Sequence, residues 1–196
     1  MKEHVNDFFV KQAKKEGYRS RAAYKLIEIA ERDHLLTPGI TVVDLGAAPG
    51  GWSQVAAEKL NGRGRVIALD LLEMAALPGV TFIQGDFREP LVLAELTKNL
   101  GESALDLVIS DMSPNISGIS VVDQARGMHL AELALEFSVG QLNSGGNFLV
   151  KVFQGTGFEE FLRTMRASFA RVITRKPEAS RGRSNEIYLL GLGKRS

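Results

Sequence analysis

The amino-acid sequence predicts a Rossmann-like α/β fold, in which helices cover both faces of a mostly parallel sheet of seven strands. Short β-rich segments alternate with helical segments along most of the chain, which is typical of parallel sheets with crossover helices. The expected strands are almost continuously apolar, which indicates burial on both faces. The last two strands follow each other without a helix between them, so we expect an antiparallel edge.

The elements follow from local patterns of apolar residues and from residues that stop helices. The expected strands span Thr41–Leu45, Arg65–Leu69, Val80–Gln84, Leu105–Ser110, Asn147–Phe153, Arg171–Arg175 and Glu186–Leu192. The expected helices span Ser20–Leu35, Trp52–Leu60, Leu91–Leu100, Asp123–Leu142 and Thr156–Phe169. Ser20 is expected to cap the first of these helices, and Thr156 with Glu159 forms a capping-box pattern before the last.

Composition is that of one globular domain over residues 1–196, with 44% hydrophobic and 24% charged residues. The absence of cysteine excludes disulfides, thiolate zinc sites, iron–sulfur clusters and cysteine nucleophiles. No apolar segment approaches the roughly 18 residues that span a bilayer. The first residues are polar and do not resemble a signal peptide. We therefore expect a cytoplasmic protein that makes no contact with membranes.

Charge is distributed unevenly along the chain. Residues 1–37 and 163–196 carry net charges of +2 and +7, whereas residues 38–162 carry −8. Two basic ends around an acidic middle are expected if both ends contact a polyanion such as RNA. The segment 1–37 is then a basic helical segment that contributes to RNA binding. The simpler interpretation is two solvated basic surfaces.

A glycine-rich turn follows the first expected strand, in the sequence DLGAAPGGW from Asp44 to Trp52. In such sheets, ligands bind beyond the carboxyl ends of the strands. The turn does not have the dinucleotide pattern G-x-G-x-x-G, because Ala48 stands at the second glycine position. Pro49 has no N–H to donate to a phosphate. The turn therefore favours a nucleoside ligand that carries no diphosphate.

Two carboxylates follow the next two expected strands. Asp70 comes after the second strand, at a place where an acidic side chain binds a ribose diol. Asp86 follows the third strand and is expected to accept a hydrogen bond from an exocyclic amine. Each is an ordinary loop carboxylate if taken alone. Together with the glycine-rich turn they indicate an adenosine-bearing cofactor, and we expect S-adenosylmethionine.

Further candidates for chemistry are Asp111, which follows the fourth expected strand, and Lys151, which lies inside the apolar strand NFLVKVF. A buried lysine is costly unless it is paired or functional, and a neutral amine can act as a base. The alternative is a lysine that extends to solvent at the strand end. Taken alone, Lys25 and Glu186 are interpreted as ordinary surface charges. His4, His34 and His129 are scattered, and we expect no metal site.

Five motifs occur together and in order: RSRAAYKL at Arg19–Leu26, DLGAAPGGWSQ at Asp44–Gln54, SDMSPN at Ser110–Asn115, VKVFQG at Val150–Gly155 and SRGRSNEIY at Ser180–Tyr188. By these motifs the chain resembles the FtsJ/RrmJ (RlmE) family of ribosomal RNA ribose 2′-O-methyltransferases. The resemblance runs from about Phe8 to Gly193. It implies a class I S-adenosylmethionine-dependent methyltransferase fold.

The resemblance also implies site residues and a reaction. The family's catalytic tetrad falls on Lys25, Asp111, Lys151 and Glu186, with Lys151 as the base or as the group that orients the hydroxyl. The family's cofactor contacts fall on Gly50, Trp52, Asp70, Asp86 and Asp111. The implied reaction is 2′-O-methylation of a uridine ribose in the A loop of 23S ribosomal RNA, with the large ribosomal subunit as the substrate. We expect a monomer without an obligate protein partner.

Other functions remain open at this point. The same tetrad serves 2′-O-methylation of tRNA or of an mRNA cap. A non-catalytic ribosome assembly factor that binds RNA could keep the fold, although it would not need a lysine inside an apolar strand. A nucleotide-dependent dehydrogenase is disfavoured by Ala48 and Pro49 in the glycine-rich turn.

Overall fold

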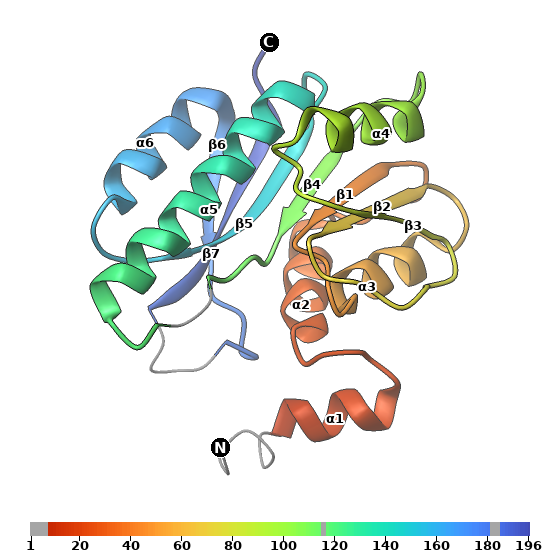
Figure 1. Ribbon diagram of the computed structural model, residues 1–196, viewed down its shortest axis with the longest axis horizontal. Coiled ribbons are helices and arrows are strands. Elements are labelled where there is room, and N and C mark those ends of the chain that lie inside the picture. The colour runs from red at the N-terminus through yellow and green to blue at the C-terminus, as the bar shows by residue number, and fades with distance from the viewer. Residues whose placement is uncertain (1–7, 115–116, 181–184) are drawn as a thin grey trace.

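The computed structural model describes residues 8–114, 117–180 and 185–196 and contains one sheet of seven strands (Figure 1). The strands are β1 (Thr41–Leu45), β2 (Arg65–Asp70), β3 (Val80–Gln84), β4 (Leu107–Ser110), β5 (Asn147–Phe153), β6 (Phe169–Arg175) and β7 (Glu186–Lys194). The helices are α1 (Phe8–Glu16), α2 (Ala23–Asp33), α3 (Gly51–Leu60), α4 (Pro90–Leu100), α5 (Ser120–Gln141) and α6 (Phe158–Ser168). The predicted α/β class is confirmed.

The strands lie in the order β3-β2-β1-β4-β5-β7-β6. The first five pair in parallel, whereas β7 is antiparallel to both of its neighbours, β5 and β6. The sequence predicted an antiparallel edge, and the structure confirms it with one refinement. The antiparallel strand is inserted next to the edge, and β6 forms the edge itself. This insertion places β7 directly beside β5.

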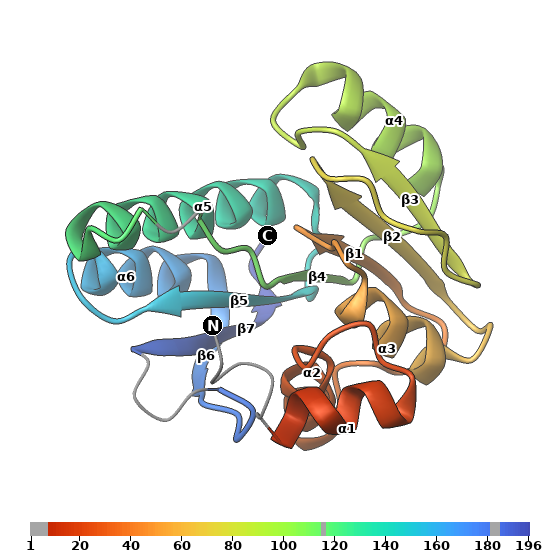
Figure 2. The same cartoon turned by 60° about the horizontal axis from the view of Figure 1, so that its bottom comes forward.

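Helices cover both faces of the sheet, and Figure 2 shows α4, α5 and α6 on one side and α1, α2 and α3 on the other. Successive residues of a strand point to opposite faces. Accordingly, Val43 packs into the core formed with α4, α5 and α6, whereas Val42 packs into the core formed with α2 and α3. Both valines are fully buried. Burial on two faces explains why the strands are nearly continuously apolar.

An ion pair attaches the end of α2 to the edge of the sheet. Arg175 on β6 donates from Nε and Nη2 to the two carboxylate oxygens of Asp33, at 2.8 and 2.5 Å. The Asp33 side chain is only 8% exposed. Two parallel hydrogen bonds of this kind fix direction as well as distance. They hold α2, which carries Lys25, in a defined position against the sheet.

Both predicted helix caps are wrong. Helix α2 begins at Ala23, after a tight turn in which the amide of Ala23 donates to the carbonyl of Ser20, and no side chain caps it. The Ser20 hydroxyl packs against Gly51 instead, where a Cβ would lie 2.4 Å from it. Helix α6 begins at Phe158, and its cap residue is Gly157 at a φ of 85°. That left-handed conformation excludes the extended N-cap geometry that the capping box requires.

The helices also differ from the sequence-based expectation in their extent and number. Helix α5 begins at Ser120, ahead of the predicted start at Asp123, and the basic N-terminal segment contains the separate helix α1. Among the helices of the described residues, none has the length and apolar character needed to span a bilayer.

Candidate active site

A cleft of about 650 Å³ opens at the carboxyl ends of the parallel strands. It lies at the point where the strand order reverses, because β1 is flanked by β2 on one side and by β4 on the other. The cleft is lined by the loops that follow β1, β2, β3 and β4 and by one face of α5. The described lining residues include Gly46, Ala48, Asp70, Asp86, Phe87, Asp111, Met112 and Leu130.

The backbone amides of residues 46–48 in the glycine-rich turn are already hydrogen-bonded within the protein. Along residues 46–49, the first two amides donate to the carbonyl of Leu69 at 2.9 and 3.1 Å. The amide of Ala48 donates to Oδ2 of Asp70 at 2.8 Å, and Pro49 has no N–H. A diphosphate needs several free amides directed at its oxygens. This turn therefore fits an uncharged nucleoside better than a diphosphate.

Asp70 and Asp86 both line the cleft, as the sequence predicted for ligand-binding residues. Asp70 also accepts the amide of Leu72 at 2.8 Å, so its carboxylate is fixed by backbone donors. Arg88 donates from Nε to both oxygens of Asp86, at 2.9 and 3.0 Å. The hydrogen bonds from Arg88 lower the pKa of Asp86 below its ordinary value. Asp86 therefore remains an ionised acceptor over a wide pH range.

Gly50 and Trp52 lie apart from the other predicted cofactor residues. Both stand at the start of α3, and neither belongs to the described lining of the cleft. The Trp52 side chain is 3% exposed, and its Nε1 donates to the carbonyl of Ala22 at 2.8 Å. Its ring packs against that of Tyr188 with the centroids 5.7 Å apart. The indole therefore supports the site through its contacts with Ala22 and Tyr188.

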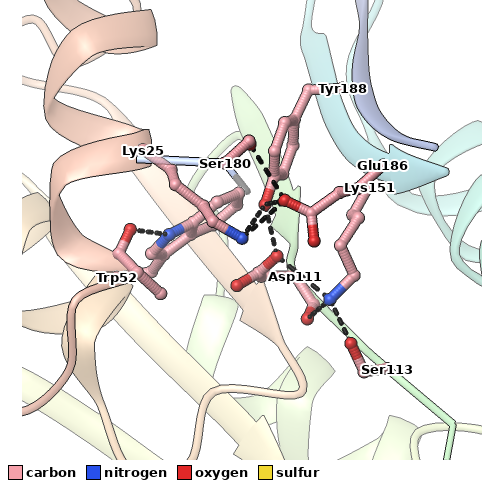
Figure 3. Close-up of polar contacts among 9 residues, drawn as sticks. Lys25, Trp52, Asp111, Ser113, Lys151, Ser180, Glu186 and Tyr188 are labelled. Carbon is pink, nitrogen blue, oxygen red and sulfur yellow. Dashed lines mark hydrogen bonds and ion pairs between the residues drawn. The ribbon is translucent and has the colours of Figure 1, made fainter. Parts of the chain in front are cut away.

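The four tetrad residues form two ion pairs near one end of the cleft (Figure 3). Nζ of Lys25, on α2, lies 2.7 Å from Oε1 of Glu186 at the start of β7. Nζ of Lys151, on β5, lies 3.2 Å from Oδ1 of Asp111, which follows β4. The fold thus brings together all four residues from distant parts of the chain.

Lys151 is buried, as its apolar strand predicted, with a residue exposure of 6%. Its amine donates to the backbone carbonyl of Asp111 at 2.6 Å and also to the hydroxyl of Ser113. These contacts exclude a lysine that extends to solvent. The amine is held next to the cleft wall that Asp111 and Ser113 form.

Glu186 is held in its ionised form by its surroundings. Burial alone would raise the pKa of Glu186, but the neighbouring amines of Lys25 and Lys151 outweigh it and lower the pKa below the ordinary value. The hydroxyl of Ser180 donates to Oε1 at 2.9 Å and acts in the same direction. The site therefore contains an anionic carboxylate between two lysines.

Sequence reasoning missed Tyr188 and Arg19. Tyr188 lies two residues after Glu186 on the same strand, so strand alternation signals that both side chains share a face. Its hydroxyl donates to Oδ1 of Asp111 at 2.6 Å. Arg19 donates from Nη1 to the carbonyls of Pro49 and Ala75, at 3.1 and 2.6 Å. Arg19 therefore links the glycine-rich turn to the loop after β2. No local sequence pattern predicts this contact.

Asp44, at the start of the glycine-rich motif, is a third residue that sequence reasoning missed. It is 1% exposed, and Ser53 donates to its Oδ2 at 2.7 Å. Burial raises the pKa of Asp44 to about 7, and the negative charges of Asp111 and Asp70 act in the same direction. The buried Asp44 carboxyl therefore differs from the cleft carboxylate Asp86, whose pKa is lowered.

Two predicted features lie outside the residues that the structure describes. They are Asn115 of the SDMSPN motif and the basic loop at 181–184. Within the described ranges, no group of three or more histidine or acidic side chains is arranged to hold a metal ion.

Comparison with known proteins shows which family the chain resembles. The model of the FtsJ-like methyltransferase family matches residues 18–194. A protein of Nitrosospira multiformis named ribosomal RNA large subunit methyltransferase E is 80% identical over 195 residues, which cover 100% of this chain and 95% of that protein. A protein of the same name from Methylobacillus flagellatus is 64% identical over 196 residues, covering 100% of this chain and 95% of that protein.

A solved structure has the same fold. It is the crystal structure of a ribosomal RNA methyltransferase from Plasmodium falciparum, which matches with a TM-score of 0.81 and 30% sequence identity. The match covers 90% of this chain and 98% of that one. Because the family model spans nearly the whole chain and the relatives match it from end to end, this protein belongs to the FtsJ-like methyltransferase family.

Proposed function

We propose that this protein transfers a methyl group from S-adenosylmethionine to the 2′-hydroxyl of a uridine ribose in the A loop of 23S ribosomal RNA, within the large ribosomal subunit. The observation that carries the proposal is the convergence of Lys25, Glu186, Lys151 and Asp111 beside the cleft. The names of the relatives support ribosomal RNA as the substrate class.

The residues of the cleft fit S-adenosylmethionine. Asp70 is fixed where it can accept a ribose diol, and Asp86 is an ionised acceptor for the adenine amine. Phe87, Met112 and Leu130 provide an apolar lining for the adenine ring. The internally bonded amides of residues 46–48 are suited to a ligand without phosphates. We therefore assign Asp70, Asp86 and Asp111 to the cofactor site, with Gly50 and Trp52 as supports for the turn.

The chain's own residues supply what the reaction needs. Bound S-adenosylmethionine provides an electrophilic methyl group, so the protein has to orient the ribose hydroxyl and accept its proton. We assign this step to Lys151, because its amine is buried at the cleft wall and held by Asp111 and Ser113. Lys151 is the group that orients the hydroxyl or, when its amine is neutral, the base that accepts the proton. Asp111 positions that amine. Lys25 and Glu186 hold the nucleotide and balance the charge of the site.

The basic N-terminal segment, residues 1–37, is proposed to contribute to RNA binding within one methyltransferase domain over residues 1–196. The described part of this segment includes α1, on which Lys11, Lys14 and Lys15 are exposed. Helix α1 lies on the same side of the sheet as α2, which carries Lys25 (Figure 2). Phosphate contacts from such lysines fix the register of RNA without reading its sequence.

The experiment that tests this function is transfer of labelled methyl from S-adenosylmethionine to purified, undermethylated large ribosomal subunits. Small subunits, tRNA and capped RNA are assayed in parallel, and Lys151→Ala is the catalytic control. We expect label only in large-subunit RNA, at one ribose that becomes resistant to alkaline cleavage. Label on tRNA or on a cap would keep the chemistry and overturn the substrate. Cofactor binding without transfer to any RNA would favour a non-catalytic assembly factor.

A further inference from the structure

We propose that the hydroxyl of Tyr188 is a positioning group that joins the two ion pairs of the site into one unit, so that Lys25 acts on Asp111 through Tyr188. This inference rests on the proposed function, because it assigns Tyr188 a role in that methyl transfer. It adds a fifth side chain to the four that the motifs identify.

The contacts of the phenol oxygen carry the proposal. Lys25 donates to it at 3.0 Å, and it donates in turn to Oδ1 of Asp111 at 2.6 Å. A phenol has one proton to donate. The shorter contact to Asp111 takes that proton in preference to the 3.4 Å contact with Oε1 of Glu186. The hydrogen bonds therefore run from Lys25 through Tyr188 to Asp111.

Asp111 is held from two sides as a result. Its Oδ1 accepts from Tyr188, at 2.6 Å, and lies 3.2 Å from Nζ of Lys151. Within the described residues, Oδ2 makes no hydrogen bond, and Asp111 lines the cleft. Tyr188 thus fixes the carboxylate that in turn positions the Lys151 amine. Without the Tyr188 hydroxyl, the hydrogen bonds that join Lys25 to Asp111 would be lost.

The fold leaves the phenol little freedom to move. Tyr188 is 0% exposed and stands directly opposite Lys151 in the register of β5 and β7. Its ring lies against that of Trp52, and Nζ of Lys25 lies 5.5 Å from the ring centroid. A side chain held by packing on this scale loses little further entropy when it forms a hydrogen bond.

The phenol also stays protonated, which keeps it a donor. Burial raises the pKa of Tyr188 well above its ordinary value, and the negative charges of Asp111 and Glu186 raise it further. Tyr188 is therefore excluded as a general base near neutral pH. Its role is to donate a hydrogen bond to Asp111 and to orient that carboxylate.

The test uses Tyr188→Phe, which removes the hydroxyl and keeps the ring that packs on Trp52. Ser138→Ala is the matched control, because it also removes a fully buried hydroxyl, on α5, that bonds only the carbonyl of Ala134. Initial rates of methyl transfer are measured over a range of S-adenosylmethionine and large-subunit concentrations, so that kcat and the KM for each substrate are obtained. Lys25→Met is assayed alone and combined with Tyr188→Phe.

We expect Tyr188→Phe to lower kcat roughly 10- to 100-fold, the effect of losing one hydrogen bond to a charged group, with KM for both substrates within about threefold. Lys25→Met should cost less in the Tyr188→Phe protein than alone, since both changes break one chain of bonds.

Other results would overturn the inference in distinguishable ways. An unchanged kcat in Tyr188→Phe, or fully additive effects with Lys25→Met, would reject the role of the phenol while leaving the proposed function intact. An equal fall in kcat in Ser138→Ala would indicate that removing any buried hydroxyl lowers kcat, and it would reject a specific role for the phenol. No transfer by the unsubstituted protein would reject the proposed function and this inference together.

Discussion

Nζ of Lys25 and Oε1 of Glu186 lie 2.7 Å apart although 161 positions separate the two residues in the chain. The side chains are 7% and 14% exposed, so solvent screens their attraction only weakly. One residue comes from the helix that precedes the sheet and the other from the strand inserted beside β5. The pair therefore forms only when α2 and β7 are held next to each other, and it links this tertiary contact to the construction of the site.

Replacing Glu186 should destabilise the fold in a manner that depends on pH. The pKa of Glu186 is lowered in the folded state, so its contribution is present above the ordinary glutamate pKa and is lost as pH falls through the folded value. We expect Glu186→Gln to reduce the free energy of unfolding by about 1–3 kcal/mol at pH 7 and by less near pH 4. Urea denaturation at both pH values measures this, with exposed Glu102→Gln as control. An equal loss at both pH values would contradict it.

Substitution of Lys151 should separate chemistry from cofactor binding. We expect Lys151→Ala to reduce methyl transfer by roughly 10²- to 10⁴-fold, because the group that accepts or orients the proton is removed. Affinity for S-adenosylmethionine, measured by isothermal titration, should remain nearly unchanged. Lys151→Met, which keeps most of the side-chain volume, guards against a packing defect. If both variants lose cofactor affinity as much as turnover, Lys151 has a structural role instead.

Arg88 should control the pH range of cofactor binding. Hydrogen bonds from Arg88 lower the pKa of Asp86, so the ionised acceptor persists to lower pH. Removing them in Arg88→Ala raises the pKa of Asp86, and the loss of S-adenosylmethionine affinity on acidification should then begin at a higher pH. Titration calorimetry between about pH 4 and pH 7 measures the shift, with exposed Arg63→Ala as control. Identical profiles for the three proteins would show that Asp86 does not bind the cofactor.

Asp44 should make the stability of the fold depend on pH in the direction opposite to that expected for Glu186. Its pKa is raised to about 7 in the folded state, so the folded protein binds a proton that the unfolded chain has released. Stability from this group is therefore lost as pH rises from about 4 to about 7. We expect Asp44→Asn to be more favourable, relative to the unsubstituted protein, at pH 8 than at pH 5. Thermal unfolding at both values tests this, and a constant difference would refute it.

The lysines of α1 should set part of the salt dependence of RNA binding. Each phosphate contact adds about 0.7–0.9 to the slope of log affinity against log salt. Replacing exposed Lys11, Lys14 and Lys15 with glutamine should weaken binding of large subunits and lower that slope by up to roughly 2–3. Lys98→Gln on α4, on the other face of the sheet, is the control. A slope unchanged from that of the unsubstituted protein would place the RNA elsewhere.

Local sequence patterns predicted much of this protein because they report what each residue faces. Alternating apolar strands and helices gave the layers and the seven strands, since burial on two faces requires apolar residues throughout a strand. The placement of Asp70, Asp86 and Asp111 at one cleft followed from their positions after parallel strands, whose carboxyl ends share one edge of the sheet. The burial of Lys151 was predicted because the residue lies inside an otherwise apolar strand.

Only the tertiary structure decided which of these residues meet. Insertion of β7 between β5 and β6 is a choice of strand partner, and strand partners are selected by packing across the whole sheet. That choice sets Tyr188 opposite Lys151 and Glu186 against Lys25. The expected caps at Ser20 and Thr156 failed because tertiary contacts and a left-handed glycine set those helix starts. Sequence by itself determined the residues available for chemistry, whereas long-range packing decided how they are joined.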